Sequence, residues 1–148
     1  MRVGDWECHV ITQGSELLEH RIQDHWCVGI VPGTTFQIFV RYHGAGQGMY
    51  EVLIDGVRDG CGTHWFDADG VSCRGRKVKS VIRGFRKRDA FGNVSERAFT
   101  FEETHAHDRG SGGGSGTVDW MRGHITVRCF QALPMVVDEG AHDLRLGD

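Results

Sequence analysis

The sequence predicts an all-β protein that folds as a two-layer antiparallel β-sandwich of jelly-roll type. Apolar residues recur at alternate positions in several segments, far more often than at the spacing of a helix. Turn residues, among them many of the 22 glycines, separate these segments at intervals of about ten residues. These intervals leave no room for the helices that a parallel sheet needs between its strands.

The N-terminal part of the chain predicts a short meander of strands. Residues 6–12, 16–22 and 24–30 form three short segments with polar residues between them, and Gly14 lies in the first turn. Residues 16–20 are the only fragment that could be helical, and they are too few to change the fold class.

The clearest alternation lies in the next two predicted strands. The first follows a turn at residues 31–34 and directs four apolar side chains to one face: Phe36, Ile38, Val40 and Tyr42. The second, residues 50–56, repeats the pattern and ends in Asp55-Gly56, a pair typical of a tight hairpin turn.

Three further strands complete the predicted sandwich. One contains Trp65 and Phe66 and ends in a turn at residues 67–70. The other two show alternating apolar residues within residues 96–103 and 123–130. The last segment is too short to fold alone, so it must return to the sheet already built.

The domain organisation predicted from the sequence is a single domain at residues 1–133. Residues 104–117, dominated by glycine and serine, are predicted to form a flexible loop within it. The tail at residues 134–148 has no clear apolar period, and two interpretations stay open: it is disordered, or it docks on a neighbouring molecule.

Composition narrows the class of protein. An aromatic content of 9% and a hydrophobic content of 39% exclude a disordered chain, and no apolar run is long enough to cross a membrane. The N-terminus carries charge and Trp6 where a secretory signal needs a continuous apolar core, which predicts an intracellular protein. The five irregularly spaced cysteines are therefore predicted to be reduced.

The most unusual segment is residues 74–88, called here the cationic stretch. It contains eight positive charges and no acid, which leaves nine Lys and Arg against twenty Asp and Glu elsewhere, a net charge of −11. As a strand, residues 76–83 would turn Val78, Ser80 and Ile82 inward and the cations outward, and residues 86–88 would continue into a loop. The predicted partner-binding residues are Arg74, Arg76, Lys77, Lys79, Arg83, Arg86, Lys87 and Arg88.

Three interpretations of this stretch are open. Charged residues on an edge strand protect a sheet from aggregation. Cations also bind nucleic-acid phosphates, although the low pI of about 6.3 and the single aromatic Phe85 within the stretch argue against this. We favour a protein partner or self-association, because a cationic ribbon on an acidic body has the electrostatic complementarity that fixes register.

Metal and catalytic motifs are weak. His105 and His107 would point to one face of a strand, as metal ligands do, but no carboxylate follows at the spacing such sites use. Cys61 and His64 form one further pair, short of the four ligands of a closed zinc site. No nucleophile motif or phosphate-binding loop occurs. We therefore expect neither metal nor cofactor and no enzymatic activity, with a metal-dependent enzyme that uses His105 and His107 as the remaining alternative.

The order of several short motifs resembles a β-rich domain of unknown function that is abundant in fungi. The matching segments, spread over residues 4–130, are residues 14–20, 26–36, 50–56, 82–85, 99–101 and 123–127. The chain departs from that pattern at His20, at Trp26-Cys27 and at Ala98. The resemblance implies a compact β-sandwich without assigned catalytic residues, and it transfers no function.

The function predicted from these observations is a non-catalytic structural or interaction module. It would dock in a larger protein assembly, for example a shell or a capsid, through the cationic stretch and the acidic body. The main alternative is a nucleic-acid-binding accessory protein that uses the same stretch. No membrane partner is expected.

Overall fold

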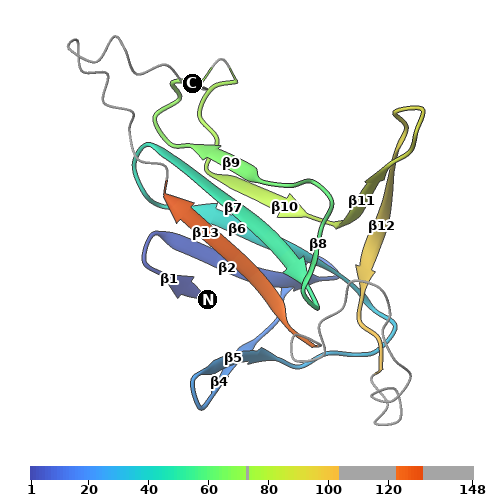
Figure 1. Ribbon diagram of the computed structural model, residues 1–148. Coiled ribbons are helices and arrows are strands. Elements are labelled where there is room, and N and C mark those ends of the chain that lie inside the picture. Colours follow the sequence, from blue (N-terminus) through green and yellow to red (C-terminus); the bar gives the residue numbers. More distant parts are fainter. Residues whose placement is uncertain (73, 104–122, 132–148) are drawn as a thin grey trace, which may run out of the picture.

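The structure is a computed structural model that describes residues 1–72, 74–103 and 123–131 (Figure 1). These residues form thirteen strands and no helix. The strands are β1 (Arg2–Val3), β2 (Trp6–Thr12), β3 (Ser15–Glu16), β4 (Glu19–Ile22), β5 (His25–Val28), β6 (Thr35–Tyr42), β7 (Gln47–Ile54), β8 (Val57–Arg58), β9 (His64–Asp67), β10 (Lys79–Ile82), β11 (Gly84–Arg88), β12 (Val94–Thr100) and β13 (Ile125–Gln131).

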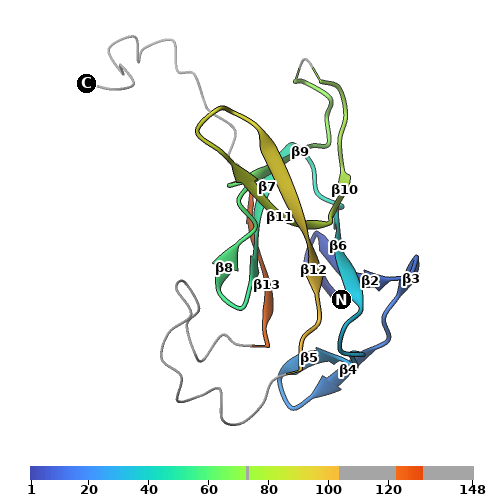
Figure 2. The ribbon, with the colours of Figure 1, turned by 90° about the vertical axis from the view of Figure 1, so that its right-hand side faces the viewer.

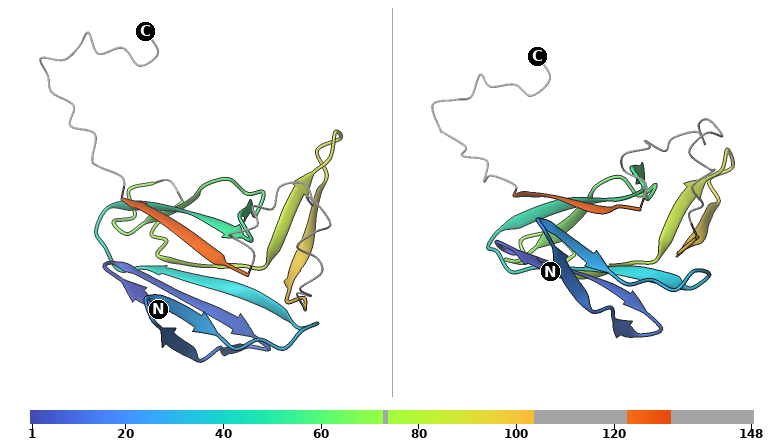
Figure 3. Two further views of the ribbon diagram at one scale, coloured as in Figure 1. Left: turned by 60° about the horizontal axis from the view of Figure 1, so that its bottom comes forward. Right: turned by 90° about the horizontal axis from the view of Figure 1, so that it is seen from below.

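The strands build two antiparallel layers, which are seen nearly edge-on in Figure 3. The first sheet has the order β1-β2-β6-β12-β11, with β3 beside β2 and β10 beside β6. The second has the order β13-β7-β8, with β9 also paired to β7. Strands β4 and β5 form a separate hairpin. The predicted all-β, two-layer antiparallel sandwich is therefore confirmed, and the successive long strands β6 and β7 lie in opposite layers.

The core lies between β6 and β7. The four alternate residues predicted to face inward from β6 are buried, with exposed fractions of at most 3%. Tyr50 and Val52 on β7 meet them from the other layer and are fully buried. Each such side chain contributes roughly 1.5–3 kcal/mol by leaving water, so this alternation is the main source of stability.

The two layers are joined along one side. Backbone groups of Asp67, at the end of β9, and Lys77, just before β10, exchange two hydrogen bonds of 2.8 and 2.9 Å. The Asp67 carboxylate also accepts hydrogen bonds from the backbone N–H groups of Gly70 and Ser72, at 3.0 and 2.6 Å. The bond from Ser72 is the main reason that the pKa of Asp67 is lowered. The turn predicted at residues 67–70 is confirmed and closes this joined side.

Other local predictions meet mixed outcomes. The Asp55-Gly56 turn forms, with φ of 52° and 80°, the left-handed conformation that a two-residue hairpin requires. Residues 16–20 are not helical, because they are divided between β3 and β4. Residues 86–88 belong to strand β11 and not to a loop. The predicted loop at 104–117 and the tail at 134–148 lie outside the described residues.

Candidate functional site

A β-hairpin made of β11 and β12 extends away from the sandwich and is called here the arm, residues 84–100 (Figures 1 and 2). Strand β10 pairs with β6 as far as Ile82, after which the chain pairs with β12 instead. The change of partner occurs at Gly84, where a Cβ would lie 2.2 Å from the carbonyl oxygen of Arg97. Only glycine allows the two strands to approach this closely.

The base of the arm is fixed to both layers. The backbone N–H of Arg86 donates a 2.7 Å hydrogen bond to the carbonyl oxygen of Asp59, between β8 and β9. On the other strand, Phe99 is buried in the core, and Phe85 meets its ring edge-to-face at 4.9 Å between centroids. Because the base contacts both sheets, the arm leaves the body in a defined direction.

The structure places all eight predicted partner-binding residues at the surface. The inward side of the strand is also as predicted: Ile82 is buried, and Val78 and Ser80 are partly buried. The cations follow three consecutive parts of the chain. Arg74, Arg76 and Lys77 precede β10, Lys79 and Arg83 lie on or beside it, and Arg86, Lys87 and Arg88 lie on the arm.

The arm carries its cations on both of its faces. Neighbouring residues of a strand point to opposite sides, so Lys87 is separated from Arg86 and Arg88. Arg86 Nε donates a 3.1 Å hydrogen bond to the carboxylate of Glu96 directly across the hairpin, and this bond raises the pKa of Arg86. Arg97 adds a further cation, with its guanidinium carbon 5.2 Å from the centre of the Phe85 ring.

The tip of the arm is an ordered turn. The Asp89 carboxylate accepts hydrogen bonds from the backbone N–H groups of Phe91 and Asn93, at 2.9 and 2.8 Å. It also accepts one from the Asn93 side chain at 3.1 Å, and the hydrogen bonds from Asn93 lower the pKa of Asp89. The Phe91 ring is 91% exposed on this turn. The arm therefore presents an aromatic ring at its end and cations along its length.

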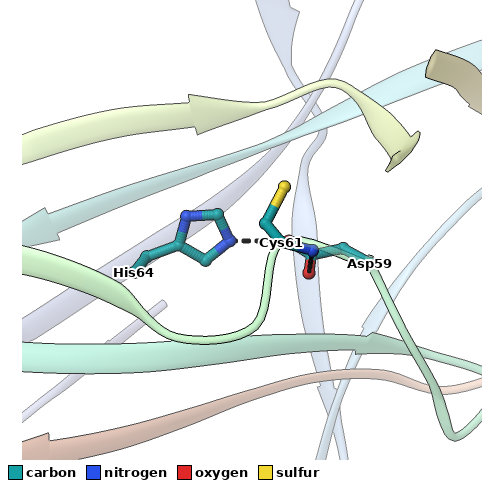
Figure 4. A group of neighbouring side chains, drawn as sticks. All are labelled: Asp59, Cys61 and His64. Carbon is teal, nitrogen blue, oxygen red and sulfur yellow. Dashed lines mark hydrogen bonds and ion pairs between the residues drawn. The ribbon is translucent and has the colours of Figure 1, made fainter. Parts of the chain in front are cut away.

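A second group of chemically reactive side chains lies near the base of the arm (Figure 4). Asp59, Cys61 and His64 each offer one potential ligand atom, and these atoms lie within 4.8 Å of one another. His64 Nε2 lies 2.6 Å from Asp59 Oδ2, and Asp59 Oδ1 accepts a 3.0 Å hydrogen bond from the Cys61 backbone N–H. Asp59 is 1% exposed.

Sequence reasoning found two members of this group and missed the third. Cys61 and His64 were recognised as a pair, but Asp59 stands two residues before Cys61, and the spacing D-x-C-x-x-H was the available signal. Burial raises the pKa of the Cys61 thiol, and the Asp59 charge raises it further, whereas Arg86 lowers it. His105 and His107 lie outside the described residues, so the structure does not test that pair.

Comparison with family models, curated proteins and solved structures gave no match. The resemblance to a fungal β-rich domain therefore stays a prediction. Within the part of the chain that the structure describes, no helix is long and apolar enough to span a membrane.

Proposed function

We propose that the protein is a non-catalytic interaction module that docks in a larger protein assembly through the arm and the cationic stretch. The observation that carries the proposal is the exposed Phe91 ring on a hydrogen-bonded turn, at the end of a hairpin that carries exposed cations. Aromatic rings accompanied by arginine are the groups that most often dominate the free energy of protein–protein binding.

The ordered tip supports this function energetically. A partner that accepts the Phe91 ring gains from the burial of its apolar surface, while the Asp89 hydrogen bonds have already fixed the backbone of the turn. The usual cost of ordering a loop at an interface is therefore small. The contacts of Arg86 and Phe85 at the base likewise fix the direction of the arm, so that little ordering of the arm is needed on binding.

The charge distribution favours an acidic protein partner, which includes a second copy of this chain. The cationic stretch contains eight of the seventeen basic residues, and the other residues carry a net charge of −11. The arm of one copy would contact the acidic body of the next copy in a head-to-tail arrangement. Such an arrangement forms a closed ring or shell when the rotation between successive copies adds up to a full turn. A component of a shell or capsid is the form of assembly we favour.

The experiment compares two triple charge reversals of the full chain. Lys79→Glu, Lys87→Glu and Arg88→Glu change the docking surface, and Arg2→Glu, Arg21→Glu and Arg58→Glu produce the same change of net charge elsewhere. Light scattering at low and high salt, with co-purification from native lysate and mass spectrometry, measures assembly. We expect the first variant alone to lose assembly, and added salt to weaken assembly of the unmodified chain. A chain that stays monomeric and binds no acidic protein would contradict the proposal.

The second candidate function is nucleic-acid binding, which the exposed ring of Phe91 favours. Bases stack on exposed aromatic rings beside cations, and Phe91 is far more exposed than Phe85, the aromatic residue of the cationic stretch itself. Titration with single-stranded and duplex DNA and RNA separates the two functions. This candidate would be supported if the chain bound nucleic acid and the logarithm of the binding constant fell steeply and linearly with the logarithm of the salt concentration.

A further inference from the structure

The segment from the end of β8 to the first residue of β9 contains three different metal-ligating groups within five residues of one another. A carboxylate, a thiol and an imidazole lie close together on Asp59, Cys61 and His64, with their ligand atoms within 4.8 Å of one another. The chain returns on itself here through two glycines in the left-handed conformation, Gly60 and Gly62, with φ of 86° and 70°. The turn that these glycines allow brings the three residues close together.

We propose that Asp59, Cys61 and His64 bind one Zn²⁺ ion, with the fourth position taken by water. The hydrogen bond of 2.6 Å between His64 Nε2 and Asp59 Oδ2 occupies the place of the ion. At zinc–ligand distances of 2.0–2.3 Å, two ligands of a tetrahedral site lie roughly 3.3–3.7 Å apart. The imidazole and carboxylate must therefore separate by about 1 Å, and ligand atoms near the 4.8 Å limit must approach by a similar amount, to admit the metal.

The identity of the donors selects zinc among the common ions. A thiolate and an imidazole are poor ligands for Mg²⁺ and Ca²⁺, which require oxygen. The carboxylate makes the set unfavourable for Cu⁺, which prefers soft sulfur ligands. Zinc accepts sulfur, nitrogen and oxygen in one tetrahedral site. Binding displaces the Cys61 thiol proton to solvent, and the proton through which His64 Nε2 donates to Asp59 Oδ2 leaves that nitrogen, so that Nε2 coordinates the ion while Nδ1 carries the remaining ring proton.

Neighbouring groups hold the three ligands in position. The backbone N–H of Cys61 donates to Asp59 Oδ1, which leaves Oδ2 for the metal. The His64 ring is stacked on Tyr50 at 4.8 Å between centroids, and Tyr50 is fully buried in the core. The Asp59 carbonyl oxygen accepts the Arg86 N–H at the base of the arm. Such supporting contacts orient metal ligands.

The test uses the full chain stripped with a chelator and titrated with Zn²⁺ alone. Competition with a chromophoric chelator gives the affinity, and Co²⁺ substitution reports thiolate coordination through its charge-transfer absorption. We expect one ion bound at this site, an increase in Tm on addition of Zn²⁺, and both effects reduced in Cys61→Ala and His64→Gln. The affinity should fall at least about tenfold in each variant.

The controls separate this site from other ligands of the same kind. Cys27→Ala and His25→Gln remove a thiol and an imidazole from the β5 strand and should leave zinc binding unchanged. The double variant His105→Gln and His107→Gln should also leave it unchanged. Binding that is lost in that double variant and retained in Cys61→Ala would overturn the inference, as would the absence of both zinc binding and the cobalt–thiolate absorption in the unmodified chain. Asp59→Asn is not relied upon, because Asp59 is buried and its loss endangers folding.

Discussion

A Cβ on Gly60 would lie 1.9 Å from the carbonyl oxygen of Arg86. No atom can occupy that position, so the segment between β8 and β9 approaches the arm as closely as a glycine permits. A hydrogen bond holds the two segments together at this point, because the Arg86 N–H donates to the carbonyl oxygen of Asp59, the residue before Gly60, at 2.7 Å. The packing of the arm against the second layer therefore depends on the absence of one side chain.

Substitution Gly60→Ala is expected to destabilise the protein by about 2–4 kcal/mol, because it combines a left-handed backbone with a clash against backbone atoms. Gly33→Ala is the matched control. Gly33 has the same φ of 86°, but its Cβ would meet no atom within 4 Å. The control should cost only about 1–2 kcal/mol for the conformation itself. Urea unfolding of both variants measures the difference, and equal losses would show that the approach to Arg86 is unimportant.

A hydrogen bond between side chains of the two layers should contribute to stability. The Tyr50 hydroxyl on β7 and the Ser80 hydroxyl on β10 are hydrogen-bonded to each other. We expect Tyr50→Phe and Ser80→Ala each to cost about 1–2 kcal/mol, with a coupling of about 1 kcal/mol in the double variant. Tyr42→Phe provides the control, since its hydroxyl donates to Ala45 within one loop. The losses of unfolding free energy in Tyr42→Phe and Ser80→Ala should add in the double variant.

Tyrosine ionisation should be delayed in the native protein. Burial raises the pKa of Tyr50 to about 12 and also raises that of Tyr42, and the chain contains only these two tyrosines. A pKa raised on folding means that the neutral form stabilises the native state. This stability is fully present below the unfolded value of about 10 and is lost as the pH rises through about 12. Tyrosinate absorbance should appear at a higher pH in the native chain than in urea, and equal titration of the native and the unfolded chain would contradict the prediction.

Acid stability should depend on Glu7. Its two carboxylate oxygens lie 2.8 Å from His9 Nε2 and 2.7 Å from His43 Nε2, and these hydrogen bonds lower its pKa from 4.5 to about 2. A lowered pKa stabilises the native state above pH 4.5, and this contribution is lost as the pH falls toward 2. Between pH 2 and pH 4.5, unfolding of Glu7→Gln should therefore take up about one proton fewer than unfolding of the unmodified chain.

The measurement for Glu7 is urea unfolding at a series of acidic pH values. Glu102→Gln serves as the control, since it removes an exposed carboxylate outside this hydrogen-bonded group. The control should show the same pH dependence as the unmodified chain. A Glu7→Gln variant with that same dependence would rule out the role of the two histidine contacts.

Local pattern was sufficient to predict the strands, but not their partners. The alternation in β6 and β7 directed the correct side chains inward, because a period of two requires only neighbouring residues. Nothing in that pattern states that β6 and β7 lie in opposite layers, since that depends on the conformation of residues 43–46 and on long-range packing. The strand at residues 86–88 was likewise predicted as a loop, because a run of cations is as compatible with an exposed hairpin as with a loop.

The candidate sites show the same division between local and long-range information. Exposure of the cations followed from their charge and was predicted residue by residue. The arm was missed because the need for glycine at position 84 arises from the close approach of Arg97 on another strand, which the local sequence does not show. Asp59 was missed because a single buried carboxylate resembles any turn residue in sequence. Its contacts with Cys61 and His64 exist only once the turn has formed.

The backbone bonds between Asp67 and Lys77 make the sandwich mechanically uneven. Along that edge a separating force must break hydrogen bonds, whereas between β2 and β13 the layers meet through side chains, with Cys8 of one beside Cys129 of the other. The two layers are thus held by backbone hydrogen bonds on the side that carries the first cations of the cationic stretch. A partner bound to those cations would pull on the side of the sandwich where the layers are hydrogen-bonded to each other.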